Sequence, residues 1–234
     1  MSNYLSILTS QRYAITKKLF SSIEVNNINS TIGVADKIGN DFRQTKGVFA
    51  IRRLLTSIPS LTPILFSNNI KQLIQSFGNG YFLSKSIYFD KPSLSNWFVA
   101  YHQDLTINVV QKIETEGFTN WTNKNGFYAV QPPLKYLENT ITLKIHLDDT
   151  DENNGALWVK AKSHLEGVSR IENIVGMYEE DICRVQKGCG MLMKPLLFHA
   201  SKRNTNNKQR RVIHLEFSNM NLPNGLEWSE KIEL

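Results

Sequence analysis

A histidine and an aspartate stand two residues apart in the stretch YHQDLTINV, residues 101–109. His102 and Asp104 come at the end of an apolar and aromatic run, Trp97 to Tyr101, whose composition favours a β-strand. Because residues two apart in a strand point to the same side, the imidazole and the carboxylate can be aimed at one point. Two such ligands do not complete a metal site, so a third must come from elsewhere in the chain.

The remaining histidines are His146, His164, His199 and His214. His199 is the best third ligand because it ends the apolar stretch in KPLLFHAS, whereas His164 in KSH fits a structural turn. Two histidines and one carboxylate on one face of an octahedron leave other positions open, which is the arrangement used by non-haem Fe(II) oxygenases. An arginine follows in QRRVIHLEF, and its planar fork can pair with the far carboxylate of a co-substrate.

Five stretches of the chain, in order, resemble the phytanoyl-CoA dioxygenase family of Fe(II)- and 2-oxoglutarate-dependent oxygenases: YHQDLTINV, VQPP, ITLKIHLDDTDENNGALWVKAKSH, KPLLFHAS and RRVIHLEF. The resemblance runs from TKGVFAIRRLL to GLEWSE and is strongest to small bacterial members whose substrates are largely unassigned. It implies a double-stranded β-helix, which is a jelly-roll or cupin-like barrel. It also implies Fe(II), 2-oxoglutarate and O₂, with formation of succinate and CO₂ coupled to hydroxylation of a substrate.

The resemblance carries over to individual residues. It implies that His102, Asp104 and His199 hold the metal, that Arg210 pairs with the far carboxylate of 2-oxoglutarate, and that Ser201 helps to hold that carboxylate.

The stretch from Ile141 to Asp148 alternates between two faces. One face carries Ile141, Leu143, Ile145 and Leu147, and the other carries Thr142, Lys144, His146 and Asp148. We expect N-terminal helices to cover the apolar face, so that the polar face lines the barrel near the metal; a polar face in water is the alternative. Lys144 is then a candidate for contacting the co-substrate, and His146 for contacting the substrate.

Three further polar residues lie in the matched stretches. Gln103 is a candidate for the co-substrate, and Arg52 in AIRRLL and Gln131 in VQPP are candidates for the substrate. A surface salt bridge for Arg52 and a polar loop position for Gln131 are the alternatives.

In QRRV, only one of the two neighbouring arginines can reach the co-substrate, because adjacent strand residues face opposite ways. Arg211 shares its face with Ile213, Leu215 and Phe217, whereas Arg210 shares its face with Val212, His214 and Glu216. The more polar set suits the barrel interior, so the alternation predicts that Arg210 faces inward.

The elements that position these residues divide the chain at about residue 80. We expect a single domain over residues 1–234, mainly β, with helices over about 1–79 and the jelly-roll over about 80–234. Ser10 could begin a helix that carries Tyr13 to Ile23, and SNNIKQLIQSFGNG predicts a helix that ends at Gly78. Seven short β-type runs follow, and residues 114–131 are expected to form a long functional loop.

Composition excludes several other classes. The 234 residues carry a net charge of +6, but the one densely basic stretch, SKRNTNNKQRR, has no interleaved aromatic residues for base stacking, so we expect a solvated loop and no nucleic-acid partner. No apolar run nears the ~20 residues that span a bilayer. The N-terminal stretch lacks signal-peptide features, and two cysteines, Cys183 and Cys189, fit free thiols in the cytoplasm. LDDTDENNG departs from the EF-hand template and predicts a tight polar turn.

The sequence therefore predicts a dioxygenase that hydroxylates a small polar metabolite or natural-product intermediate. Halogenation is disfavoured because carrier-dependent halogenases of this fold lack the carboxylate ligand, and Asp104 is present. A non-catalytic metal-binding jelly roll and a zinc hydrolase are the alternatives. The substrate and the oligomeric state stay open.

Overall fold

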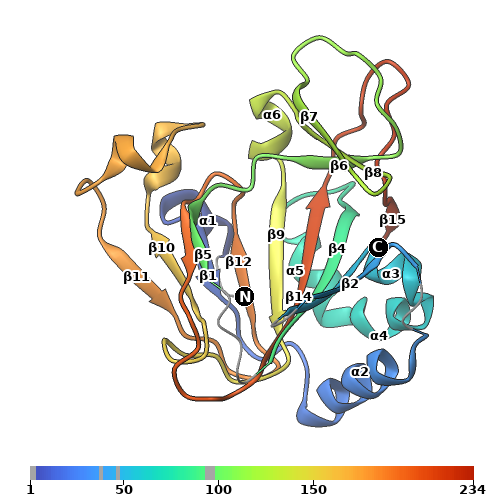
Figure 1. The fold of residues 1–234 in the computed structure, drawn as a ribbon, viewed down its shortest axis with the longest axis vertical. Coiled ribbons are helices and arrows are strands. Elements are labelled where there is room, and N and C mark those ends of the chain that lie inside the picture. The colour runs from blue at the N-terminus through green and yellow to red at the C-terminus, as the bar shows by residue number, and fades with distance from the viewer. Residues whose placement is uncertain (1–3, 37–38, 46–47, 93–97) are drawn as a thin grey trace.

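The computed structural model describes residues 4–36, 39–45, 48–92 and 98–234 of the chain (Figure 1). In these residues the strands form three antiparallel sheets. The helices are α1 (Tyr4–Ser10), α2 (Ser22–Val34), α3 (Leu54–Ser57), α4 (Thr62–Leu65), α5 (Asn68–Gln75) and α6 (Leu134–Glu138), with 3₁₀ turns η1 (Pro59–Leu61), η2 (Ser163–Glu166) and η3 (Ile171–Ile174).

The largest sheet has eight strands, in the order β1-β12-β9-β14-β4-β3-β2, with β15 also paired to β4. Its strands are β1 (Tyr13–Ile15), β2 (Phe42–Thr45), β3 (Val48–Arg52), β4 (Phe82–Lys91), β9 (Ile141–His146), β12 (Gly190–Met193), β14 (Arg210–Ser218) and β15 (Ile232–Glu233). A four-stranded sheet has the order β11-β10-β13-β5, from β5 (Val99–His102), β10 (Leu157–Lys160), β11 (Glu180–Cys183) and β13 (His199–Ser201). The third sheet is β6-β8-β7, from β6 (Ile107–Val109), β7 (Thr119–Lys124) and β8 (Phe127–Gln131).

The large sheet lies between helices α2 to α5 and the four-stranded sheet (Figure 1). The apolar face of β9 packs with helical residues in the main core, as the alternation predicted: Ile141, Leu143, Ile145 and Leu147 are buried there beside Leu54, Leu61, Leu65 and Ile70. The opposite face of β9 and β14 therefore looks toward the four-stranded sheet. The predicted fold class, mainly β with a jelly-roll arrangement and N-terminal helices, is confirmed, although the hydrogen-bonded sheets do not close into one continuous barrel.

The prediction of a helix beginning at Ser10 is wrong. Helix α1 ends at Ser10, and Tyr13 to Ile15 form β1, which pairs with β12. The next helix begins at a capping box instead: the Glu24 backbone N–H donates to the Ser21 hydroxyl at 3.3 Å, and the Ser21 N–H donates to the Glu24 carboxylate at 2.6 Å. These reciprocal bonds satisfy two donors that have no partner inside the helix, so they fix its start.

The expected loop over residues 114–131 contains a hairpin. Strands β7 and β8 pair around Asn125 and Gly126, which have φ of +56° and +85°. An Asn-Gly pair with both φ values positive is the preferred two-residue hairpin turn, because its twist matches that of the flanking strands. The N-terminal third likewise holds a hairpin, β2 and β3, where helix alone was expected.

Other expectations agree with the structure. Helix α5 ends at Gln75, shortly before Gly78 with φ of +135°. Residues 202–209 form a mostly exposed loop, and both cysteines are buried and free. Trp97, the first residue of the apolar run before His102, lies outside the described residues. Among the described helices, none has the length and apolar character needed to cross a bilayer.

Candidate metal and co-substrate site

The structure brings together the two histidines and the aspartate singled out in the sequence. His102 ends β5 and His199 begins β13, and the two residues are direct cross-strand partners. Asp104 follows β5, where its N–H donates to the Pro195 carbonyl at 2.9 Å. One ligand atom from each of the three side chains lies within 4.8 Å of the others. A strand pair and the turn after it therefore converge three donors on one point.

Both imidazoles are oriented by backbone carbonyls. His102 Nδ1 is 2.9 Å from the Ala100 carbonyl oxygen, and His199 Nδ1 is 2.9 Å from the Leu197 carbonyl oxygen. Since a carbonyl only accepts, each Nδ1 carries the proton and each Nε2 offers a lone pair. The Nε2 atoms lie 3.7 Å and 3.6 Å from the two Asp104 carboxylate oxygens. Metal-binding histidines are commonly held in this way through the ring nitrogen that does not bind the metal.

The electrostatics of the cluster also suit a divalent cation. Burial lowers the pKa of His199 to about 4, against the opposing effect of Asp104, so its imidazole is neutral at pH 7. Burial by itself would raise the pKa of Asp104, but the nearby His199 and Lys144 outweigh it and hold that pKa below its usual value. Asp104 Oδ2 is buried without a hydrogen-bond partner. The neutral imidazole of His199 and the ionised, unpartnered carboxylate of Asp104 suit a bound metal, and the donor set of two histidines and one carboxylate fits Fe(II).

A cavity of about 220 Å³ opens beside the cluster, between the two larger sheets. We call it the metal cavity. Its lining comprises Lys85, Ile87, Phe89, Val99, His102, Asp104, Lys144, Leu157, His199, Ala200, Ser201, Arg210, Val212, His214 and Glu216.

The strand alternation predicted for β14 is confirmed. Arg210, Val212, His214 and Glu216 line the metal cavity, whereas Ile213, Leu215 and Phe217 lie in the core beneath the helices. Arg211 faces away from the cavity and binds Asp148 through two side-chain hydrogen bonds of 2.9 Å and 2.6 Å.

Arg210 is a buried cation without a counterion. No hydrogen bond or ion pair joins its guanidinium to another described residue, its Nε is buried without a partner, and burial lowers its pKa to about 10. Lys91, its cross-strand partner on β4, is fully buried, and among the described residues its ammonium donates to the Lys202 carbonyl alone, at 2.8 Å. Burial and the neighbouring Arg210 lower the pKa of Lys91 to about 8. Arg210 lines the cavity and Lys91 lies beside it, so this end of the cavity is electropositive and suited to an anion.

Two other predicted residues also lie at the cavity. The Ser201 hydroxyl lines it and donates to the Gly155 carbonyl at 3.0 Å. Lys144 lines it from β9, and burial lowers its pKa although Asp104 and Glu216 oppose that effect.

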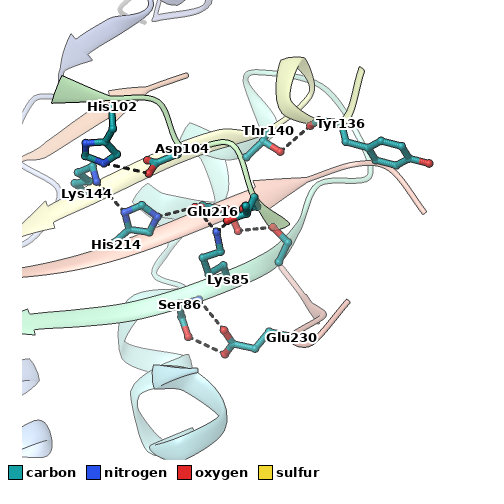
Figure 2. A network of polar contacts seen from close by, with 12 residues as sticks. Lys85, Ser86, His102, Asp104, Tyr136, Thr140, Lys144, His214, Glu216 and Glu230 are labelled. Carbon is teal, nitrogen blue, oxygen red and sulfur yellow. Dashed lines mark hydrogen bonds and ion pairs between the residues drawn. The ribbon is translucent and has the colours of Figure 1, made fainter. Parts of the chain in front are cut away.

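Lys144 belongs to a polar chain that runs along the cavity wall (Figure 2). Its Nζ is 2.9 Å from His214 Nδ1, and His214 Nε2 is 2.9 Å from the Glu216 carboxylate. Lys85 completes the chain with a bond of 2.8 Å to the same carboxylate oxygen. Burial alone would raise the pKa of Glu216, but Lys85 and His214 lower it, so the carboxylate is ionised and paired.

The remaining predicted residues lie farther from the cluster. His146 shares the polar face of β9; its Nδ1 is 2.8 Å from the Thr150 hydroxyl, and its Nε2 is buried without a partner. Burial, together with Arg210, lowers the pKa of His146 to about 3. Gln131 accepts a hydrogen bond of 2.8 Å from Asn120. It lines neither the metal cavity nor a second cavity that adjoins the metal cavity at β4.

Gln103 does not line the metal cavity. Its amide donates to the carbonyls of Gly167 and Leu196, both at 2.7 Å, and accepts from the Ser169 N–H at 3.0 Å. Because Gln103 lies between His102 and Asp104 on an extended segment, its side chain points to the opposite side, where it secures a neighbouring loop.

Sequence reasoning missed Lys85 and Lys91, and it did not assign a role to Glu216. The signal for the two lysines was present in SKSIYFDK, where Lys85, Ile87, Phe89 and Lys91 alternate along β4. Lysines on a central strand are rarely buried unless paired, so two of them on one face of a strand indicate a polar interior.

The fold and the donor set together define a jelly-roll protein with a two-histidine, one-carboxylate metal centre. Residues 66–212 match the sequence profile of the phytanoyl-CoA dioxygenase family (PhyH), and the chain therefore belongs to this family. It is an Fe(II)- and 2-oxoglutarate-dependent oxygenase, not a metal-binding scaffold or a zinc hydrolase. No curated protein sequence matches the chain.

Solved structures with a similar fold share little sequence with this chain. HygX from Streptomyces hygroscopicus, solved with nickel, 2-oxoglutarate and hygromycin B, is 13% identical with a TM-score of 0.67, covering 93% of this chain and 87% of its own. EctD from S. alaskensis, solved with bound Fe, is 15% identical with a TM-score of 0.72, covering 93% and 76%. SnoK, a non-heme alpha-ketoglutarate-dependent carbocyclase from nogalamycin biosynthesis, is 14% identical with a TM-score of 0.67, covering 93% and 84%.

Proposed function

We propose that this oxygenase hydroxylates a small polar molecule, with His102, Asp104 and His199 as the ligands of Fe(II) and Arg210 as the anchor of 2-oxoglutarate. The observation that carries the proposal is the position of Arg210. Its guanidinium is buried, has no counterion among the described residues, and lines the same cavity as the three metal-binding candidates. A buried cation left without a partner costs several kcal/mol, which a bound carboxylate would offset.

The protein's own groups have separate roles at this site. The carbonyls behind His102 and His199 hold the two imidazoles in the tautomer that can bind a metal. Arg210 would pair with the far carboxylate of the co-substrate, and Ser201 would hold that carboxylate in place. Lys144 lines the cavity and would contact the co-substrate. Fe(II) and 2-oxoglutarate, when bound, supply the activation of O₂, and decarboxylation yields succinate and CO₂.

Hydroxylation is favoured by the intact carboxylate ligand, because Asp104 fills the position that carrier-dependent halogenases of this fold leave to chloride. Polar substrates are favoured by the cavity wall, which carries Lys144, His214 and Glu216 on one side. HygX, which has a similar fold, was solved with hygromycin B bound beside nickel and 2-oxoglutarate. His146 is kept as a substrate-side candidate because its buried Nε2 lacks a partner.

Turnover of the co-substrate tests the proposal. Purified protein with Fe(II) and 2-oxoglutarate should slowly form succinate without any added substrate. Asp104→Ala should abolish succinate formation and reduce bound iron, since the site loses its only carboxylate ligand. Asp36→Ala, which removes an exposed carboxylate at the end of α2, is the matched control and should behave as wild type. Unchanged succinate formation in Asp104→Ala would overturn the ligand assignment.

A further inference from the structure

A second cavity, of about 250 Å³, adjoins the metal cavity. The two cavities share Lys85 and Ile87, so they adjoin at β4. We call the second one the distal cavity. It lies between the large sheet and the β6-β8-β7 sheet, and its lining comprises Arg52, Lys85, Ile87, Thr106, Asn108, Thr122, Lys124, Phe127 and Ala129.

The size of the metal cavity indicates that a second molecule must extend into the distal cavity. Ligand pockets in proteins measure about 300–1,000 Å³, and the metal cavity, at about 220 Å³, is smaller than this range. On the proposed function it already has to hold iron and 2-oxoglutarate. Arg210 and Glu216 lie at opposite ends of the β14 face, and Glu216 pairs in register with Lys85, where the distal cavity begins. The open space for a substrate therefore continues away from Arg210.

The charged side chains that line the distal cavity are all cationic. Arg52, Lys85 and Lys124 are its charged residues, and no carboxylate is among the described residues that line it. Lys85 is already paired, with Glu216 at 2.8 Å and the Thr106 carbonyl at 3.1 Å. The lining thus carries at least two cations in excess, in a partly enclosed space where charges are less screened than in bulk water.

Arg52 differs from its neighbour Arg53 in having no acidic partner among the described residues. Both guanidinium groups lie over the Phe127 ring, at 5.2 Å and 5.3 Å from its centroid. Arg53 is tied to Asp41 by two hydrogen bonds of 2.9 Å. Stacking on Phe127 fixes the plane of the Arg52 guanidinium and leaves its N–H donors available for a planar or tetrahedral oxyanion.

We propose that the distal cavity binds the anionic group, a carboxylate or a phosphate, of the molecule that this enzyme oxidises. Arg52 donates to the anion, Lys124 closes the outer side of the cavity, and Lys85 marks the boundary with the metal cavity. This places the carbon skeleton of the substrate between the anion site and the metal ligands. The inference rests on the proposed function in one respect, namely that the bound molecule is the substrate. Anion binding in the distal cavity itself requires neither metal nor turnover.

Three compounds with one carbon skeleton test the inference: glycerol 3-phosphate, glycerate and glycerol. Calorimetric titration of the metal-free protein should show binding of at least one of the two anions and none of glycerol. Arg52→Gln should weaken anion binding at least about tenfold, equivalent to about 1.4 kcal/mol, because charge-assisted hydrogen bonds are lost. Arg43→Gln removes the same charge from an exposed position on β2 and should leave the affinity unchanged. The anion that binds more tightly identifies the preferred group.

Every other outcome contradicts the inference. Absence of anion binding, equal binding of glycerol, or equal losses in Arg52→Gln and Arg43→Gln would exclude an anion site in the distal cavity. Loss of binding in Arg210→Ala would show that the anion occupies the metal cavity instead. If the anions bind but only neutral or cationic metabolites stimulate succinate formation, the site exists but does not serve the substrate. Failure of the proposed function itself would appear separately, as absence of succinate in the wild type.

Discussion

Replacing Arg210 with alanine should weaken 2-oxoglutarate binding, whereas the same change at Arg211 should not. The two residues are neighbours on β14 and carry the same charge, but only Arg210 lines the metal cavity. Arg211 is engaged outside, with Asp148. The pair therefore separates the effect of strand face from the effect of net charge.

The expected magnitude follows from the burial of Arg210. A hydrogen bond to a charged group contributes about 1.5–3 kcal/mol, and about 1.4 kcal/mol corresponds to a tenfold change in affinity. Arg210→Ala should therefore raise the Kd for 2-oxoglutarate by about 10- to 150-fold. Arg211→Ala removes a half-exposed ion pair, so it should leave the Kd nearly unchanged and cost on the order of 1 kcal/mol of stability.

Anaerobic titration of each Fe(II)-loaded variant with 2-oxoglutarate measures both affinities without turnover. Thermal unfolding of the same samples checks that each variant is folded. A large loss in Arg211→Ala with none in Arg210→Ala would mean that the strand faces are interchanged. Equal losses in both variants would mean that net charge, and not a direct contact, governs the affinity.

Four further substitutions test other features of the structure. Lys144→Ala and His146→Ala should each slow succinate formation while the iron content, measured by metal analysis, stays stoichiometric. Loss of iron in either variant would contradict the placement of these residues outside the ligand set. Burial raises the pKa of Glu230, so its protonated form favours folding, and this contribution is lost as the pH rises through the raised pKa. Glu230→Gln should therefore resist urea unfolding better than wild type at neutral pH but not in acid. The opposite order would refute the burial effect. Gly188 has φ of +83°, and an added Cβ would collide with the Phe20 backbone oxygen. Gly188→Ala should therefore destabilise the fold by at least about 1 kcal/mol in the same urea assay. An unchanged unfolding midpoint would show that the backbone relaxes.

The parts of the site that the sequence predicted well are those on long, strongly alternating strands. Residues 213–218 of β14 and the six residues of β9 alternate between apolar and polar positions, so the inward face of each strand could be inferred directly. Placement of His102, Asp104 and His199 in one cluster depended on spacing and on the family resemblance together, because His199 begins a strand of only three residues.

The parts that were missed have weak or competing signals. Strand β1 has three residues, too few to show alternation, and its apolar residues were assigned to a helix. Strand β7 is almost entirely exposed and polar, so no buried face marks it, although the Asn-Gly turn that follows was a usable signal. The start of α2 was marked by Ser21 and Glu24, whose spacing is that of a capping box. Local turn and cap chemistry was thus more informative than apolar spacing in these segments.

The candidate site is divided between two sheets: His102 and His199 lie on the four-stranded sheet, with Asp104 directly after β5, and Arg210 and Lys144 lie on the eight-stranded sheet. A metal bound by His102, Asp104 and His199 alone would stabilise only the layer that holds the four-stranded sheet. A dicarboxylate that reaches both groups would act as a removable cross-link between layers, and it would add about 2.7 kcal/mol to the stability when present at a hundred times its Kd. The resistance of this enzyme to unfolding would then rise with the supply of its co-substrate as well as with the supply of iron.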